Sequence, residues 1–269
     1  MAEQRKKIGL ALGSGGFRGP AHIGVIKTLL KHNIPIDYIA GASIGALVGA
    51  YYALNQEVIN LEKEIAISQR DKILLFLDIS RSGGLLSGER IKKIISQILK
   101  QADFKETQIP FKAITTDLIS GDSVILCKGQ LAEAVRASIS VPLTFRPVKF
   151  KGKLLVDGGL SNPVPDNIVK GMGADIVISV NLYNKYNYNY PNPPMAKIIM
   201  RAAEIMLYDL AKNNLRHTDI LINPDTTELA KVSRLKKYFN SAAISKMIKA
   251  GEEATEKVIP DIKRLLEEK

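Results

Sequence analysis

The stretch IAGASIGALVGAYYAL, residues 39–54, contains the pattern G-x-S-x-G at Gly41, Ser43 and Gly45. This spacing is typical of a sharp turn between a strand and a helix, on which a serine hydroxyl stands exposed. The uncharged run from 38 to 56 is long enough to suggest a membrane span. It is rich in small residues and tyrosine, so we interpret it as a buried strand, a turn and a helix.

A serine hydroxyl is a weak nucleophile until a neighbouring base accepts its proton. The chain has three candidate histidines, His22, His32 and His217. His217 follows the other candidate residues in the chain and would complete the Ser…Asp…His order of α/β-hydrolases. His22 lies beside a glycine-rich loop, where packing explains it, and His32 lies near a helix end, where a charge–dipole role suffices. The base for Ser43 stays open at this point.

The rest of the chain alternates strands with helices, which predicts an α/β fold with a largely parallel sheet. The expected strands are 7–12, 36–40, 111–117, 123–127, 145–150, 153–156, 174–181 and 219–223. Helices are expected at 44–54, 130–138, 195–212 and from Pro20, with a mostly helical region at 57–100 that a connection at 82–88 interrupts. The exposed loop 183–194 is the only candidate domain boundary. Too few strands follow it to build a second sheet, so we predict one domain.

Composition narrows the possible partners and the compartment. The net charge is +11, which favours contact with an anionic membrane surface or nucleic acid, although a solvated surface with excess lysine explains it equally well. The lysines are scattered and no nucleic-acid motif is present, so we predict no nucleic-acid partner. Cys127 is the only cysteine, which excludes an intramolecular disulfide. We find no signal peptide and no metal-ligand cluster, and expect a cytoplasmic protein without a metal or cofactor.

A glycine-rich loop, residues 13–19, follows the first expected strand and precedes a helix. The dinucleotide-binding pattern G-x-G-x-x-G would need a glycine where Arg18 stands, so we reject nucleotide binding. Gly15 and Gly16 let the backbone approach a ligand closely, and the following helix start offers unpaired N–H groups. Such a loop can hold an anion, including the oxyanion of acyl transfer. A third motif, Asp157-Gly158-Gly159, is by itself a good turn.

Taken in this order, the three motifs resemble those of the patatin-like phospholipases, and most closely the small bacterial members similar to the neuropathy-target-esterase branch. Ser14 replaces the first glycine of the family's oxyanion motif, and residues 136–148 also resemble the family's connecting segment. The resemblance implies a three-layer fold with helices on both faces of the sheet. It covers 7–170, a catalytic core, whereas 171–269 form a C-terminal strand-and-helix part of the same domain.

The resemblance implies a serine acyl hydrolase that cleaves carboxyl esters of lysophospholipids or phospholipids, with Ser43 as nucleophile and Asp157 as base. The implied supporting residues are Gly15, Gly16, Phe17 and Arg18 for the oxyanion or substrate, and Gly41, Gly45, Gly158 and Gly159 for the motif turns. Membrane contact would be peripheral, at the inner membrane surface. The alternative is a catalytically silent lipid-binding or regulatory protein on the same scaffold. The helix at 195–212 either covers the core or lines an acyl-chain channel, and the sequence leaves the oligomeric state open.

Overall fold

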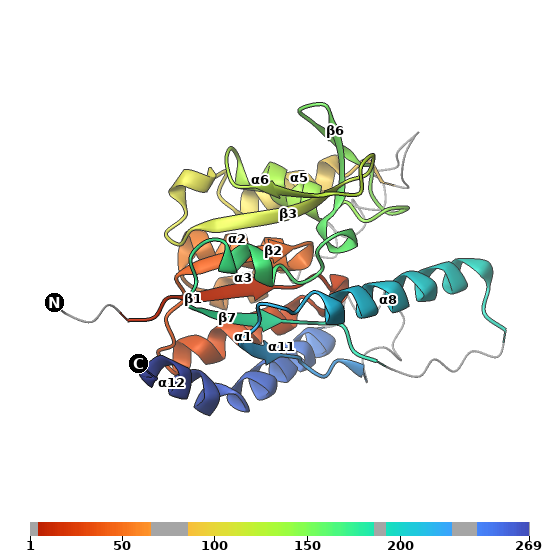
Figure 1. The fold of residues 1–269 in the computed structure, drawn as a ribbon. Coiled ribbons are helices and arrows are strands. Elements are labelled where there is room, and N and C mark those ends of the chain that lie inside the picture. Colours follow the sequence, from red (N-terminus) through yellow and green to blue (C-terminus); the bar gives the residue numbers. More distant parts are fainter. Residues whose placement is uncertain (1–4, 66–85, 186–191, 228–240, 269) are drawn as a thin grey trace.

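The computed structural model describes residues 5–65, 86–185, 192–227 and 241–268, which form an α/β fold around one sheet (Figure 1). Within these residues the sheet has the strand order β5-β6-β3-β2-β1-β7-β8, and β4 also pairs with β3. The pairs β1–β2, β1–β7, β2–β3 and β7–β8 are parallel, which confirms the prediction of a largely parallel sheet. The strands are β1 (Ile8–Leu12), β2 (Tyr38–Ala42), β3 (Phe111–Asp117), β4 (Ser123–Leu126), β5 (Val148–Phe150), β6 (Lys153–Asp157), β7 (Ile176–Val180) and β8 (Ile220–Ile222).

The helices largely occupy the segments in which they were expected. They are α1 (Pro20–Lys31), α2 (Ile44–Asn55), α3 (Ile59–Ile65), α5 (Glu89–Ile98), α6 (Leu131–Ser138), α7 (Asp166–Lys170), α8 (Met195–Asn213), α11 (Ser241–Glu256) and α12 (Ile259–Glu267), with the short helices η1 (Gly16–Arg18), η2 (Phe104–Glu106) and η3 (Gly158–Leu160). Residues 66–85 of the expected helical region 57–100, which include part of the connection at 82–88, and residues 186–191 of the loop 183–194 lie outside the described residues. No helix in the described ranges is both long and apolar enough to cross a membrane.

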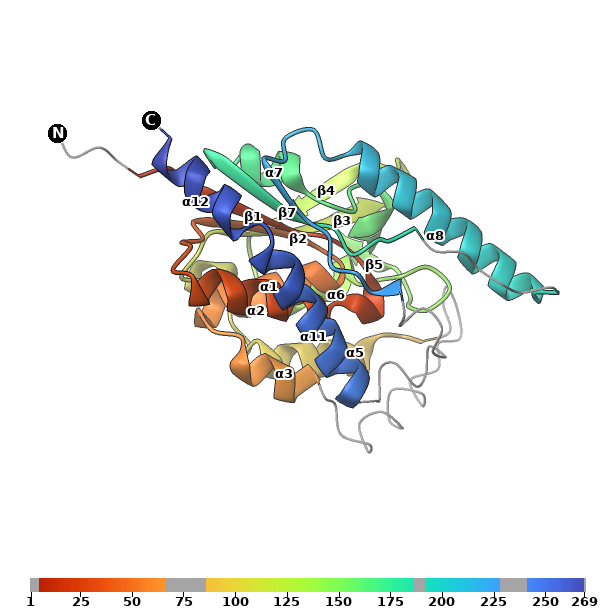
Figure 2. The ribbon, with the colours of Figure 1, turned by 90° about the horizontal axis from the view of Figure 1, so that it is seen from below.

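Alternating side chains of the central strands separate the core into two layers, because successive residues of a strand point to opposite faces. On β1, Leu10 and Leu12 join the large core under α1, α2 and α11, whereas Ala11 joins a smaller core under α7 and α8. Figure 2 shows the same division, with α1, α2 and α11 on one side of the strands and α7 and α8 on the other. The expected three layers are therefore confirmed.

Two strands meet end to end along one edge of β3. Residues 113–116 of β3 pair with β4 on one edge. The other edge is divided, since Ile114 pairs with Ala42, the last residue of β2, and Thr115 pairs with Asp157, the last residue of β6. Because β2 runs parallel and β6 antiparallel to β3, their carboxyl ends face each other. This register places residue 43 beside residue 157.

The neighbouring strands complete the site's surroundings. β1 pairs with β2 in parallel, so the glycine loop that follows Leu12 emerges beside the turn that follows Ala42. On its other edge β1 pairs with β7, and β7 pairs with β8. One sheet thus contains strands that precede residue 170 in the chain and strands that follow it. The segment after β7 leaves the sheet at the same edge as the glycine loop.

Candidate active site

The turn at Ser43 is tight and strained. Ser43 has φ 54° and ψ −122°, a positive φ that is uncommon for a residue with a side chain and that clusters at functional sites. A Cβ on Gly45 would overlap the carbonyl of Leu12, and a Cβ on Gly41 would overlap the carbonyl of Gly45. Both glycines of the motif are therefore required by the close approach of strand and helix around the serine.

A hydrogen-bond chain fixes the backbone of the serine turn. The N–H of Ser43 donates to Oγ of Ser138 at 2.8 Å, and that hydroxyl donates in turn to the carbonyl of Ile114 at 2.5 Å. Ser138 is the last residue of α6 and is fully buried. The N–H of Ser43 is thus occupied, so an oxyanion at this site must find its donors elsewhere.

The side chains of Ser43 and Asp157 are in direct contact. Oγ of Ser43 donates a 2.6 Å hydrogen bond to Oδ2 of Asp157, and the N–H of Gly159 donates to Oδ1 at 2.8 Å. The N–H of Asp157 itself donates to the carbonyl of Ser140 at 3.0 Å. Ser43 is 5% exposed and Asp157 6% exposed, so bulk water scarcely reaches either. Each oxygen of the carboxyl group has its own donor, which sets its orientation.

Burial changes the proton affinity of Asp157. Loss of hydration raises its pKa from 3.8 to about 6, against the hydrogen bonds from Ser43 and Gly159, which lower it. A carboxylate with this pKa is a stronger base than an exposed aspartate and is still ionised in most molecules at neutral pH. Asp157 is therefore chemically suited to accept a proton from Ser43.

Gly158 and Gly159 complete the third motif after Asp157, and both are tightly enclosed by neighbouring atoms. A Cβ on Gly158 would overlap the carbonyl of Ile114. A Cβ on Gly159 would lie 2.5 Å from Oγ of Ser14 and 3.0 Å from Oδ1 of Asp157. Glycine at these positions allows the chain to turn directly after Asp157 and to present the Gly159 N–H to the carboxyl group.

The glycine loop is held by its first residues and leaves donors open at its apex. The N–H of Gly13 donates to Val180 and that of Ser14 to Pro163. Gly16 has φ 57°, in the left-handed region that favours glycine. In the described part of the chain, the N–H groups of Gly15 and Gly16 have no hydrogen-bond partner. These two donors are available to an anion.

Two contacts set the place of this loop. A Cβ on Gly19 would overlap the side chain of Ile44, so the end of the loop packs against the residue that follows Ser43. The carbonyl of Gly13 lies 2.8 Å from Nε2 of His22, which must be the donor. Burial lowers the pKa of His22 to about 4, so its ring is neutral at pH 7. His22 thus holds the start of the loop by a hydrogen bond to the backbone, as the packing interpretation predicts.

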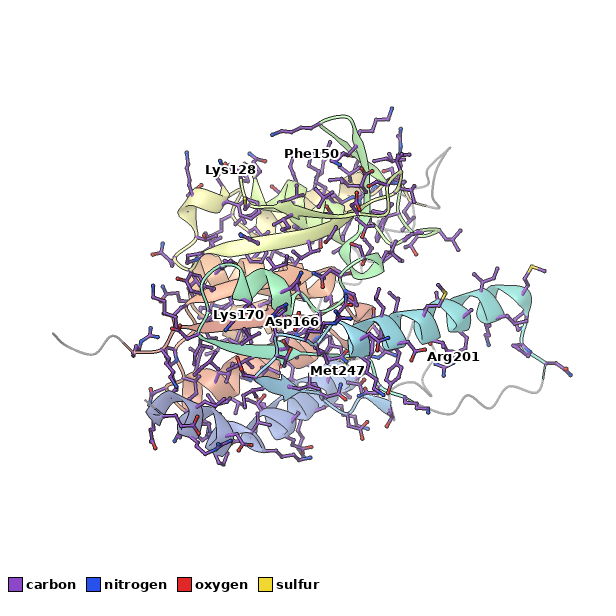
Figure 3. The ribbon with its side chains drawn as sticks, in the orientation of Figure 1. Lys128, Phe150, Asp166, Lys170, Arg201 and Met247 are labelled. Carbon is purple, nitrogen blue, oxygen red and sulfur yellow. The ribbon has the colours of Figure 1, made fainter. Side chains whose placement is uncertain are left out.

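Arg18 and Phe17 form the outer part of the loop. The guanidinium of Arg18 lies 4.7 Å from the centre of the Phe17 ring and 6.0 Å from that of Tyr183. Arg18 is only 5% exposed, yet no carboxylate of the described residues forms an ion pair with it. Phe17 packs against Met247 of α11, which Figure 3 labels. The loop therefore presents at the site a largely buried cation that no described carboxylate neutralises.

The serine that departs from the family pattern has a specific partner. Oγ of Ser14 and the hydroxyl of Tyr183 form a 2.9 Å hydrogen bond, and the two residues are 2% and 7% exposed. Burial raises the pKa of Tyr183, and the nearby charge of Asp157 raises it further. The bond joins the glycine loop to the segment after β7, next to Gly159 and Asp157. Sequence reasoning marked the loop 183–194 but gave Tyr183 no role.

The histidine alternative finds no support in the geometry. The side chain of His217 is exposed, and its backbone N–H donates to Oδ2 of Asp166 at 2.8 Å. Across the described ranges, no hydrogen bond joins its ring to Ser43 or Asp157. Of the contacts that sequence reasoning missed, Ser138 and Ser140 lie in the segment 136–148 that it had singled out.

Comparison with known proteins places the chain in a family. The family model of patatin-like phospholipases matches residues 10–168, more than half of the chain. The chain is 41% identical over 179 residues to an uncharacterised NTE family protein of Mycobacterium bovis, a match that covers 65% of this chain and 49% of that protein. It is 32% identical over 181 residues to lysophospholipase NTE1 of Pyricularia oryzae, a match that covers 66% of this chain and 12% of that protein. The chain thus spans about half the length or less of these curated relatives.

The fold itself has a counterpart among solved structures. The crystal structure of VipD from Legionella pneumophila matches with a TM-score of 0.60, covering 97% of this chain and 67% of that chain at 14% identity. At this identity the likeness concerns the fold alone. Together with the family match and the three motifs at the carboxyl edge of the sheet, it confirms the resemblance seen in the sequence. The chain belongs to the patatin-like phospholipase family.

Proposed function

We propose that this protein is a serine acyl hydrolase in which Ser43 is the nucleophile and Asp157 the general base. The observation that carries the proposal is the 2.6 Å hydrogen bond from Oγ of Ser43 to Oδ2 of Asp157. Direct contact lets the proton pass from serine to carboxylate in one step, so no imidazole is required. The raised pKa of Asp157, about 6, makes that transfer less unfavourable than it would be to an exposed aspartate.

The reaction takes two steps. Oγ of Ser43 attacks the ester carbonyl while Asp157 accepts its proton, which gives a tetrahedral intermediate. The protonated Asp157 then donates this proton to the departing alcohol oxygen, and an acyl-serine remains. Water next attacks the acyl-serine with Asp157 as base, and the carboxylic acid leaves as Ser43 regains its proton. Proton and oxygen are balanced, since one water is consumed for each ester bond that breaks.

The glycine loop would stabilise the negative charge of the intermediate. The N–H groups of Gly15 and Gly16 lack partners among the described residues and belong to the loop that packs against Ile44. Fixed donors aimed at a developing oxyanion contribute about 10²–10³ in turnover each. The occupied N–H of Ser43 favours this loop over the nucleophile's own backbone as the oxyanion hole.

Arg18 has two compatible roles at the same site. Its guanidinium stacks on Phe17 and so stiffens the loop. As a buried cation without a carboxylate partner in the described chain, it also suits the phosphate of a phospholipid or lysophospholipid. We propose these lipids as the substrate class, and the relative named as a lysophospholipase supports it. We further propose peripheral contact with anionic membranes, which the net charge of +11 favours.

Reaction with a fluorophosphonate probe tests the proposal. Wild-type protein should be labelled covalently at Ser43, and Ser43→Ala should not be labelled. Hydrolysis of short esters, lysophospholipids and diacyl phospholipids should then be compared, with Ser43→Ala as the blank. A folded wild-type protein that neither reacts with the probe nor cleaves any ester would instead support the silent lipid-binding alternative.

A further inference from the structure

Helix α8 is amphipathic, but its apolar face is exposed to solvent. Its residues Met195, Ile198, Ile199 and Met206 follow the i, i+3, i+4, i+11 spacing of one helix face, and they are 77%, 53%, 51% and 71% exposed. A surface helix of a globular protein normally turns such a face to the core. The apolar side of α8 is therefore its solvent side.

The ion-paired side chains near the middle of the same helix are mostly covered, whereas Asp209 and Lys212 near its carboxyl end are exposed. Arg201 and Glu204 form an ion pair of 3.5 Å, and their side chains are only 24% and 20% exposed. These two residues lie about half a turn of the helix away from the exposed apolar face. Figure 3 labels Arg201 on the projecting part of α8. From Met195 to Met206, α8 thus covers its ion pair and exposes its described apolar side chains.

Among the described contacts, the carboxyl-terminal end of α8 joins the helix to the body. Its Ala211 is fully buried in the smaller core, and Leu207 and Tyr208 pack against that core. From there α8 extends away from the sheet toward Met195, and Figures 1 and 2 agree on this projection. The earlier alternatives for this helix were core cover or channel lining. Among the side chains that the structure describes, those of its carboxyl-terminal part cover the core.

More exposed apolar side chains belong to two segments that contact or directly follow Asp157. Val141 directly follows Ser140, whose carbonyl holds Asp157, and Leu160 ends the short helix that begins after Asp157. Val141, Leu143 and Leu160 are 41%, 69% and 40% exposed. Ser43 is 5% exposed, so a long acyl chain must leave its own apolar surroundings to reach it. An apolar surface beside the site reduces the cost of that transfer.

We propose that the exposed face of α8, formed by Met195, Ile198, Ile199 and Met206, inserts into an anionic lipid surface and holds the Ser43 site against it. The choice of lipid as the occupant rests on the proposed function and on charge. The chain has 38 basic and 27 acidic residues, and α8 carries the basic residues Lys197, Arg201 and Lys212 against the acidic residues Glu204 and Asp209. Apolar residues on one face and basic residues on the other are typical of helices that lie in a membrane interface.

The experiment replaces Ile198 and Met206 together by aspartate. Sedimentation is measured with vesicles of phosphatidylcholine, with and without phosphatidylglycerol. Burial of two such side chains in lipid contributes favourable free energy to binding. The double variant should therefore bind the anionic vesicles about a hundredfold more weakly. Turnover of a soluble p-nitrophenyl ester should stay within about twofold of wild type, because neither residue touches the catalytic pair. Hydrolysis of lipid in the vesicles should fall with the binding.

Ile59→Asp, compared with Ile198→Asp alone, is the matched control. Ile59 is 64% exposed at the start of α3, on another helix, so the same substitution there should leave vesicle binding unchanged. Equal vesicle binding by wild type and the α8 double variant would overturn the proposal. So would a wild-type dimer, detected by light scattering, that the α8 substitutions dissociate while vesicle binding persists, because the occupant would then be a second copy of the chain. Vesicle binding is measured separately from ester turnover, so an inactive protein would refute the proposed function without deciding the role of α8.

Discussion

The hydroxyl of Ser43 donates a 2.6 Å hydrogen bond to the carboxylate of Asp157, although 114 positions separate the two residues in the chain. Ser43→Ala should therefore abolish ester hydrolysis. Asp157→Asn keeps the shape but accepts no proton, and should lose most of the activity. Turnover of a p-nitrophenyl ester, with circular dichroism to establish folding, measures both effects. His217→Ala is the control and should stay within a few-fold of wild type. A folded His217→Ala that loses orders of magnitude would refute the dyad, because members of a triad act as a unit.

Activity should follow the ionisation of Asp157. Burial raises the pKa of this carboxyl group to about 6, so the base is protonated and inactive at lower pH. We expect kcat/KM to rise with pH, to reach half its plateau near pH 6, and to fall about tenfold per pH unit well below that. The rate of fluorophosphonate labelling should follow the same curve, since it needs the same activated serine but no leaving alcohol. A flat profile between pH 5 and 7 would contradict Asp157 as the base.

Ionisation of Asp157 should also lower the free energy of unfolding of the protein. The pKa of Asp157 is raised in the folded protein above the unfolded value of 3.8. Its stabilising contribution is therefore complete below about pH 4 and is lost as the pH rises through about 6. Asp157→Asn has no charge to bury, so its free energy of unfolding should exceed that of wild type at pH 7, by an upper bound on the order of 3 kcal/mol. Urea titrations at pH 4, 5, 6 and 7 measure the difference, which should grow with pH. A constant difference would show that ionisation of Asp157 is not the cause.

Substitution at the apex of the glycine loop should affect turnover more than stability. Gly16 has φ 57°, so Gly16→Ala costs ~1–2 kcal/mol of folding free energy for its left-handed backbone. If the Gly16 N–H binds the oxyanion, turnover should in addition fall by ~10²–10³. Gly121→Ala is the control, because Gly121 has φ 79° and open space around its Cβ position. Equal losses of turnover in the two variants would assign Gly16 a purely structural role.

The bond between Ser14 and Tyr183 should support catalysis by holding the glycine loop. We expect Tyr183→Phe to lower kcat about tenfold with little change in KM, since the loop positions the transition state more than the ground state. Ser14→Gly, which restores the glycine of the family motif, should have a similar effect. The double variant should be no worse than either single one, because both remove the same bond. Independent, multiplying losses would mean that the two hydroxyls act separately.

Much of this site could be predicted from local sequence, because its main parts are motifs whose backbone geometry demands glycine. Gly41, Gly45, Gly158 and Gly159 are each enclosed so closely that a Cβ would collide with a neighbour. Such positions leave a signal in the sequence itself. The strand and helix pattern was equally visible, because both faces of the sheet are covered and its central strands are continuous apolar runs.

The remaining contacts depend on which distant residues the fold brings together. Ser138 reaches the N–H of Ser43 across 95 positions and Tyr183 reaches Ser14 across 169. A serine in a helix and a tyrosine in a loop have many common roles, so neither pattern indicates these partners. The periodicity of α8 predicted a helix correctly, but not that its apolar face is turned to solvent. That outcome depends on the direction in which the helix leaves the body.

The division of one edge of β3 between β2 and β6 makes strand register a condition of reactivity. Ala42 and Asp157 pair with consecutive residues, Ile114 and Thr115. A slip of β6 by one residue would move Asp157 by about 3.3 Å and turn its side chain to the opposite face of the sheet. A chain could then be compact and rich in secondary structure and still leave Ser43 without the carboxylate proposed as its base. An irreversible serine probe could therefore be used on a refolded sample. The fraction of molecules that it labels would measure the fraction in which β6 has paired with β3 in the correct register.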